Sequence, residues 1–256
     1  MEGPSLLIAS EYLSPFEKKQ IKEVSGNTKI GKERLVGKTV LDIFSWGKHL
    51  VFQFDDFAMR VHFMLYGTYA ASFNGKSLTG DYSKKGKPIR LEMVFEKGTI
   101  DLYSCSIKYI EDKSIKANYD FSADIMSDLW DTPLALGKIR KYPPEEIADV
   151  LLDQEIFAGV GNIIKNEVLF IVKINPQTLI KNLSEEKLLE ITIETQKFSH
   201  NFYKWRKKFE LKKHYKIYRK SICPICGGKV KRLKTGKRNR VSYFCPIDQP
   251  LNLTNK

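Results

Sequence analysis

The chain has 256 residues, of which 42% are hydrophobic, so it can bury the core of one large domain or two smaller ones. Lysine and arginine total 43 against 30 aspartates and glutamates, and the formal net charge of +13 favours a polyanionic partner, either nucleic acid or an anionic membrane surface. No segment approaches the roughly 20 apolar residues of a membrane-spanning helix, and no signal peptide is recognisable at the N-terminus. We therefore expect a cytoplasmic protein without a membrane partner.

The first part of the chain, residues 1–118, consists mostly of segments typical of short β-strands. A helix is expected before them, around residues 10–24. The segments are β-branched or aromatic, mostly alternating and bounded by turn residues, and they cover 35–44, 49–54, 58–63, 90–95 and 99–103. Such a run of strands predicts a β-sandwich or barrel. Cys105 is expected to be a lone buried thiol.

After Asp120 the pattern changes to that of helices. Residues 144–152, 162–173 and 185–212 are predicted to be helical, with breaks at 159–162 and at the Asn175-Pro176 pair. The tail from Ser221 has paired cysteines and few helix formers. The fold class is therefore α+β with several domains: a β-sandwich with flanking helices at 1–120, a helical domain at 121–220 and a cysteine hairpin at 221–256.

Positive charge is concentrated near the C-terminus. Between Asn201 and Arg240 there are 16 lysines or arginines and a single acid, Glu210, with aromatic residues interleaved. A basic, aromatic-rich stretch is suited to neutralising phosphates. This pattern favours nucleic acid over a membrane surface as the partner.

The cysteine tail predicts a structural zinc site. Cys223 and Cys226 form one pair at x₂ spacing, and Cys245 and Asp248 form a second after 18 intervening residues. This is a zinc-ribbon pattern, in which two tight turns hold one ion, although a carboxylate is an unusual fourth ligand beside three thiolates. A metal-free hairpin with Asp248 as an ordinary turn residue is the alternative.

Several motifs together span nearly the whole chain. They are Met1-Glu2-Gly3-Pro4, Ser45-Trp-Gly-Lys48, His62-Phe-Met-Leu-Tyr-Gly67, residues 151–170 with Gly159-Val-Gly-Asn162, and Arg240 five residues before Cys245. In combination they resemble the formamidopyrimidine-DNA glycosylase / endonuclease VIII family. That resemblance implies a β-rich domain, a helix–two-turn–helix segment and a C-terminal zinc ribbon.

The resemblance also implies catalytic residues. The family's chain begins with a proline, whose amine attacks the sugar, followed by a glutamate that carries protons. Glu2 matches this glutamate, Met1 stands in the place of the proline, and Lys48 matches a lysine that contacts phosphate beside the lesion. An α-amine with a reference pKa of about 8 is about one-tenth neutral at pH 7, against less than about 0.1% for a lysine. We therefore expect the Met1 amine to be the nucleophile.

The resemblance implies DNA-binding residues as well. Met64, Leu65 and Tyr66 match the loop that fills the hole left by a flipped base, as apolar wedges do between base steps. A buried strand end is the alternative for these three residues. Asn162 is expected to cap the following helix and to bind phosphate with the helix amides, and Arg240 to grip the phosphates at the flipped nucleotide.

We therefore expect a base-excision DNA glycosylase with abasic-site lyase activity and a structural Zn²⁺. Its partner would be double-stranded DNA with oxidised bases, pyrimidines rather than purines, or abasic sites. The protein would be a monomer, associated with the nucleoid when bound. The missing proline, Ser5 in place of a second glutamate and the Asp248 ligand leave open a catalytically impaired protein that binds damaged DNA. A mis-assigned start codon also stays open, whereas Lys48 and Asn162 argue against a structural chromatin-type DNA binder.

Overall fold

The computed structural model describes residues 1–79 and 84–251, and the chain divides into two compact units. The first unit contains Met1 and Ser5–Asp120, and the second contains Glu2–Pro4 and Phe121–Lys256. In the described part of the chain, no helix combines the length and the apolar character needed to cross a membrane. The division of the second unit into a helical domain and a separate hairpin stays a prediction.

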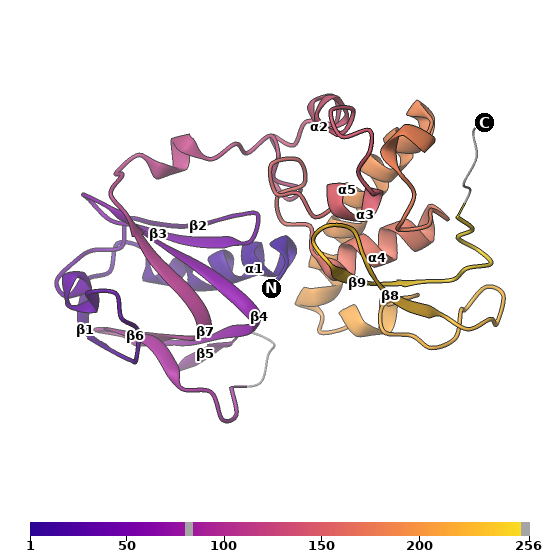
Figure 1. The fold of residues 1–256 in the computed structure, drawn as a ribbon. Helices are drawn as coiled ribbons and strands as arrows, with labels where there is room; N and C mark the ends of the chain where they lie inside the picture. The colour runs from indigo at the N-terminus through magenta and orange to yellow at the C-terminus, as the bar shows by residue number, and fades with distance from the viewer. Residues whose placement is uncertain (80–83, 252–256) are drawn as a thin grey trace. The chain divides into compact units, whose positions relative to one another are not determined.

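The first unit is a bent antiparallel sheet whose core is covered by α1 (Gly3–Leu13) (Figure 1). Its strands are β1 (Ile21–Ser25), β2 (Asp42–Trp46), β3 (His49–Gln53), β4 (Ala58–Phe73), β5 (Lys76–Thr79), β6 (Ile89–Phe95) and β7 (Gly98–Ile110). The hydrogen-bonded order is β1-β6-β7-β4-β3-β2, and β5 pairs with β4. The long strands β4 and β7 pair with each other along most of their length (Figure 1). Their pairing is broken between Phe63 and Thr68. The predicted β-sandwich is confirmed.

Two local predictions for this unit are wrong. The helix expected at 10–24 lies at Gly3–Leu13, since Pro4 falls in the first turn, where a missing amide hydrogen costs nothing. Residues 21–25 instead form β1, which pairs with the edge of β6. The strand expected at 35–44 begins only at Asp42, because a short 3-10 helix at Lys32–Leu35 and a left-handed turn at Gly37 precede it. Cys105 is buried, as expected.

The second unit is built around α4 (Asn162–Ile171), which is buried on nearly all sides from Ile164 to Phe170. Against it pack α5 (Glu185–Lys207) and the hairpin of β8 (Lys231–Thr235) and β9 (Arg240–Phe244) (Figure 1). Two shorter helices, α2 (Thr132–Ile139) and α3 (Ile147–Val150), complete the unit. The sequence pattern missed α2, which Asp131 caps by accepting a hydrogen bond from the Leu134 amide at 2.7 Å.

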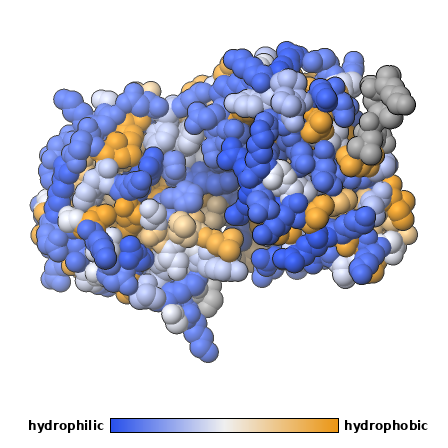
Figure 2. Space-filling model, viewed as in Figure 1, coloured by the Kyte–Doolittle hydropathy of each residue, from blue (hydrophilic) through white to orange (hydrophobic). Residues whose placement is uncertain are grey.

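A small apolar core joins the hairpin to α4; it is formed by Phe170 of α4 with Ile217, Cys223, Val230 and Cys245. So few apolar side chains rarely stabilise a segment alone, which is why such hairpins commonly depend on a metal. On the face shown in Figure 2, hydrophilic residues cover much of each unit, with apolar residues in separate patches.

Candidate functional site

The Glu2 side chain is held at the N-terminus of α4. Its Oε1 accepts a hydrogen bond from the Ile163 amide at 2.7 Å, and its Oε2 accepts one from the Ile164 amide at 3.2 Å. The first amides of a helix lack partners within the helix, and a carboxylate there is stabilised by the helix dipole. The helix therefore fixes the direction of this carboxylate.

The glycines of the turn before α4 make this arrangement sterically feasible. A Cβ on Gly161 would lie 2.4 Å from the Glu2 Cδ, and one on Gly3 would lie 2.8 Å from the Gly159 Cα. The Gly3 amide also donates to the Gly159 carbonyl at 2.8 Å. Residues 2–3 can therefore lie against the turn only because Gly3 and Gly161 carry no side chain.

Two expectations for this turn are wrong. Gly161, not Asn162, is the N-cap of α4, and Asn162 is the first helical residue. The Ile163 and Ile164 amides, which were expected to bind a phosphate, are occupied by Glu2. The carboxylate of Glu2 supplies the cap from a distant part of the sequence.

Asn162 is directed towards strand β9 instead. Its Nδ2 donates to the Val241 carbonyl at 2.9 Å, and its buried Oδ1 has no hydrogen-bond partner among the described residues. Val241 directly follows Arg240, whose side chain is exposed at the start of β9. Asn162 and Arg240, the two residues expected to bind phosphate, thus lie on elements that contact each other. Asn162 binds the residue next to Arg240.

The tip of the hairpin is anchored by Asp149 of α3. Its carboxylate accepts hydrogen bonds from the Lys237 amide at 2.5 Å and from the Arg238 amide at 3.2 Å. Gly236 has a φ of +67°, and a Cβ there would lie 2.2 Å from the Asp149 Oδ1. The turn that precedes Arg240 is therefore held in one conformation.

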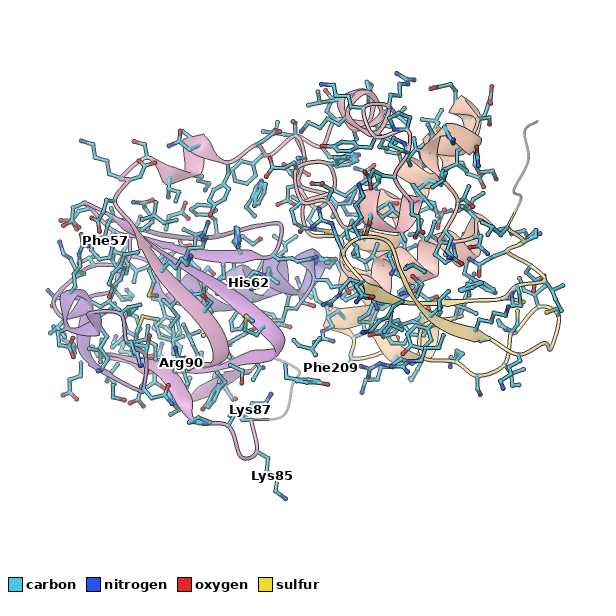
Figure 3. All side chains as sticks on the ribbon, in the orientation of Figure 1. Phe57, His62, Lys85, Lys87, Arg90 and Phe209 are labelled. Atoms are coloured by element: carbon cyan, nitrogen blue, oxygen red, sulfur yellow. The ribbon has the colours of Figure 1, made fainter. Side chains whose placement is uncertain are left out.

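In the first unit, the Met1 amine and Lys48 both act electrostatically on His62. His62 lies on β4 (Figure 3). Its pKa is lowered, mainly because the side chain is buried and then because of the positive charges of the Met1 α-amine and of Lys48. His62 is paired across the ladder with His49, and burial lowers the pKa of His49 to about 4. The charges of both expected amines, from Met1 and Lys48, thus act on one histidine.

These histidines line a pocket of about 270 Å³ together with four other residues: Arg60, Met64, Ser106 and Lys108. The sequence reasoning missed His62 and Arg60 as site residues. The alternation of apolar and polar residues in 58–63 could have indicated them. It places Arg60 and His62 on the face of the strand opposite Met59, Val61 and Phe63. A pocket lined by the cations Arg60 and Lys108 is suited to an anion.

The expected void-filling residues project from the break in the pairing of β4 and β7. Met64 is 54% exposed, Leu65 66% and Tyr66 60%, which rules out a buried strand end. The Lys87 ammonium donates to the Tyr66 carbonyl at 2.6 Å, and Gly67 lies so close to Phe63 and Ser104 that a side chain would collide. Three exposed apolar side chains on a constrained bulge have the form of a wedge.

The cysteine tail brings together the four residues expected to bind zinc. One ligand atom from each of Cys223, Cys226, Cys245 and Asp248 lies within 4.8 Å of the others, close to the spacing around a tetrahedral zinc. Backbone amides also point at the sulfurs: Ile225 at Cys223, Gly228 at Cys226, and Asp248 at Cys245, at 3.4 to 3.5 Å. Amides directed at sulfur stabilise thiolates, so this donor set fits zinc.

Comparison with known proteins identifies the fold first. A Lactococcus lactis formamidopyrimidine-DNA glycosylase, solved with DNA containing an abasic site, superposes with a TM-score of 0.81 at 23% identity, over 98% of this chain and 100% of that one. A viral DNA glycosylase gives the same score and identity over 97% and 100%. The fold is therefore that of DNA glycosylases of this type.

Sequence comparison identifies the family. A model described as "Formamidopyrimidine-DNA glycosylase H2TH domain" matches residues 131–198. The chain is 34% identical over 216 residues to endonuclease 8-like 3 of Xenopus laevis, and 30% over 209 to that of Homo sapiens. These matches cover 83% and 80% of this chain but only 35% and 34% of those proteins. The chain belongs to the formamidopyrimidine-DNA glycosylase / endonuclease VIII family.

Proposed function

We propose that this chain is a DNA glycosylase with abasic-site lyase activity, acting on damaged double-stranded DNA. One observation carries the proposal: the Glu2 carboxylate is fixed by two amides of α4, directly next in the chain to the Met1 amine. A positioned carboxylate beside an amine is what Schiff-base chemistry at a sugar requires.

The reaction begins with the damaged nucleotide outside the helical stack, where its sugar is accessible. The neutral Met1 amine attacks C1′, and the bond from C1′ to the base breaks, with the electron pair leaving on the base. Glu2 transfers the proton of the amine to the sugar ring oxygen, so that the ring opens and the imine forms. Loss of a C2′ proton then expels the 3′ phosphate, and water hydrolyses the imine.

The remaining site residues bind DNA in this proposal. Asn162 and Arg240 contact the backbone phosphates at the flipped nucleotide, and Lys48 contacts the phosphate beside it. Met64, Leu65 and Tyr66 fill the vacated space in the duplex. Oxidised pyrimidines and abasic sites are the proposed substrates, and the abasic-site DNA bound to the structurally similar Lactococcus lactis glycosylase supports the second of them.

Zinc has a structural role in this proposal. Cys223, Cys226, Cys245 and Asp248 hold the ion and thereby fold the hairpin that carries Arg240. Its chemistry is limited to holding the four ligands together, and no step of the reaction involves it.

The test is strand cleavage on two duplexes, one with an oxidised pyrimidine and one with an abasic site. The zinc-loaded protein should release the base and nick both, and Glu2→Gln should slow base release about 100-fold or more at unchanged affinity. Tight binding without base release or nicking would support the impaired binder instead. Failure to bind either duplex would contradict both the active glycosylase and the catalytically impaired binder.

A further inference from the structure

Lys165 is a fully buried lysine at the centre of the second unit. It lies on α4, and its exposed fraction is 0%. A buried charge is costly unless it is paired and hydrogen-bonded, so such a side chain has to be explained by its partners. It cannot touch DNA directly, and none of the chemistry described above involves it.

The hydrogen bonds of Lys165 lead to the strand that follows Arg240. Its Nζ donates to the Ser242 Oγ at 2.8 Å and to the Val241 carbonyl at 3.4 Å. Ser242 is itself buried and its hydroxyl lies 2.6 Å from that of Thr235 on β8. The lysine thus joins α4 to both strands of the hairpin.

Neighbouring side chains of α4 bind the same stretch of β9. Asn162 donates to the Val241 carbonyl at 2.9 Å, and Asn166 accepts from the Tyr243 amide at 2.6 Å. Three consecutive residues after Arg240 are therefore held by three side chains of one helix. Lys165 is the charged member and the most deeply buried of the three.

The charges that act on Lys165 come from β9, from α3 and the residue before it, and from the N-terminal segment. The pKa of Lys165 is lowered to about 8, by burial first and then by the positive charge of Arg240 on β9. Asp149 of α3, Glu2 of the N-terminal segment and Glu146 before α3 act in the opposite direction. Lys165 is therefore a buried cation that interacts with Asp149, which anchors the hairpin tip, and with Glu2, which caps α4.

We propose that Lys165 is a positioning residue, whose buried ammonium holds β9 against α4 and so fixes the direction in which Arg240 meets DNA. The proposal rests on the proposed function, because it assigns Arg240 a phosphate contact. Lys165 would affect the affinity for DNA only indirectly, through Arg240, and this effect would depend on the charge of the lysine. That charge is lost as pH rises through about 8, and the arginine is then held less firmly.

The test is a double-mutant cycle between Lys165→Met and Arg240→Ala in the zinc-loaded protein. The probe is a duplex with a tetrahydrofuran abasic-site analogue, which reports binding without chemistry. Lys165→Met should bind about tenfold more weakly, as for one lost charge-assisted contact, and the double variant should bind no more weakly than Arg240→Ala. Lys181→Met, which removes an exposed charge from the same unit, is the control for net charge.

A pH series separates positioning from mere structural support. Wild-type affinity should fall between pH 7 and 9 at constant salt, and the fall should be smaller in Lys165→Met, which lacks the buried ammonium. If Lys165→Met fails to fold, Ser242→Ala removes the acceptor of its shortest hydrogen bond and should show the same lack of additivity with Arg240→Ala.

Additive losses in the cycle, or a Lys165→Met affinity equal to that of Lys181→Met, would overturn this proposal while leaving the proposed function intact. Absence of binding by the wild type would instead overturn the proposed function and, with it, the role of Arg240. Hydrogen exchange gives an answer without DNA: the Tyr243 amide should exchange faster in Lys165→Met than in the wild type. Unchanged protection would mean that the lysine does not hold β9.

Discussion

Replacing Gly161 by alanine should separate catalysis from folding. The new Cβ would lie 2.4 Å from the Glu2 Cδ and 2.6 Å from its Oε1, while the φ of Gly161, −122°, is one that alanine adopts freely. The collision is with the far end of a side chain, so the carboxylate can move away. The expected cost is that of its two hydrogen bonds, about 1–3 kcal/mol of unfolding free energy.

The effect on the reaction should be far larger. A displaced carboxylate no longer carries protons at the sugar, and the loss of general acid–base catalysis amounts to about 10² to 10⁴ in rate. Single-turnover base release on an oxidised-pyrimidine duplex measures it, with thermal unfolding in parallel. Gly137→Ala in α2 is the matched control, because its Cβ meets open space and should leave the rate unchanged while stabilising the helix by about 0.5–1 kcal/mol. A Gly161→Ala rate within twofold of wild type would refute the assignment of Glu2.

Further predictions concern the wedge, the metal and the buried histidine. Leu65→Ala or Tyr66→Ala should weaken binding to a lesion duplex more than to undamaged DNA in a competition assay, and equal losses would remove the wedge role. Asp248→Cys should tighten zinc binding measured against a chelator, whereas a zinc content near zero in folded wild-type protein would contradict the metal site. Because folded His49 has a pKa of about 4, below the ordinary value of 6.5, the unfolded chain binds the extra proton. Thermal stability should therefore fall as pH drops from 6.5 towards 4, and His49→Gln should flatten that slope if burial is the cause.

The sequence predicted those parts of the fold whose signals are local. Residues 58–63 alternate in their burial, residues 49–53 form the expected strand and are buried from Leu50 to Gln53, and 162–171 forms the expected helix. The helix at Gly3–Leu13 was missed because its residues are mostly apolar on all sides and give no helical stripe. Strand β1 was missed because its formation depends on the distant edge of β6.

The candidate site shows the same limit. The residue types at Glu2, Asn162 and Arg240 were recognisable from motifs, but their partners lie far away along the chain. Glu2 caps a helix that begins 160 residues later, and Asn162 binds the carbonyl of Val241. The burial of Lys165 could not be predicted from the sequence, since a lysine in a helix is usually at the surface.

Borohydride trapping tests the central claim most directly. The protein is incubated with an abasic-site duplex, the imine is reduced, and the adduct is mapped by peptide mass spectrometry after the intact mass has identified the N-terminal residue. The account predicts a covalent adduct on the α-amine of Met1, which Glu2→Gln slows. An adduct on Lys48 would contradict the assignment of the nucleophile. No adduct and no nicking, with tight binding retained, would contradict the proposal that this chain is an enzyme.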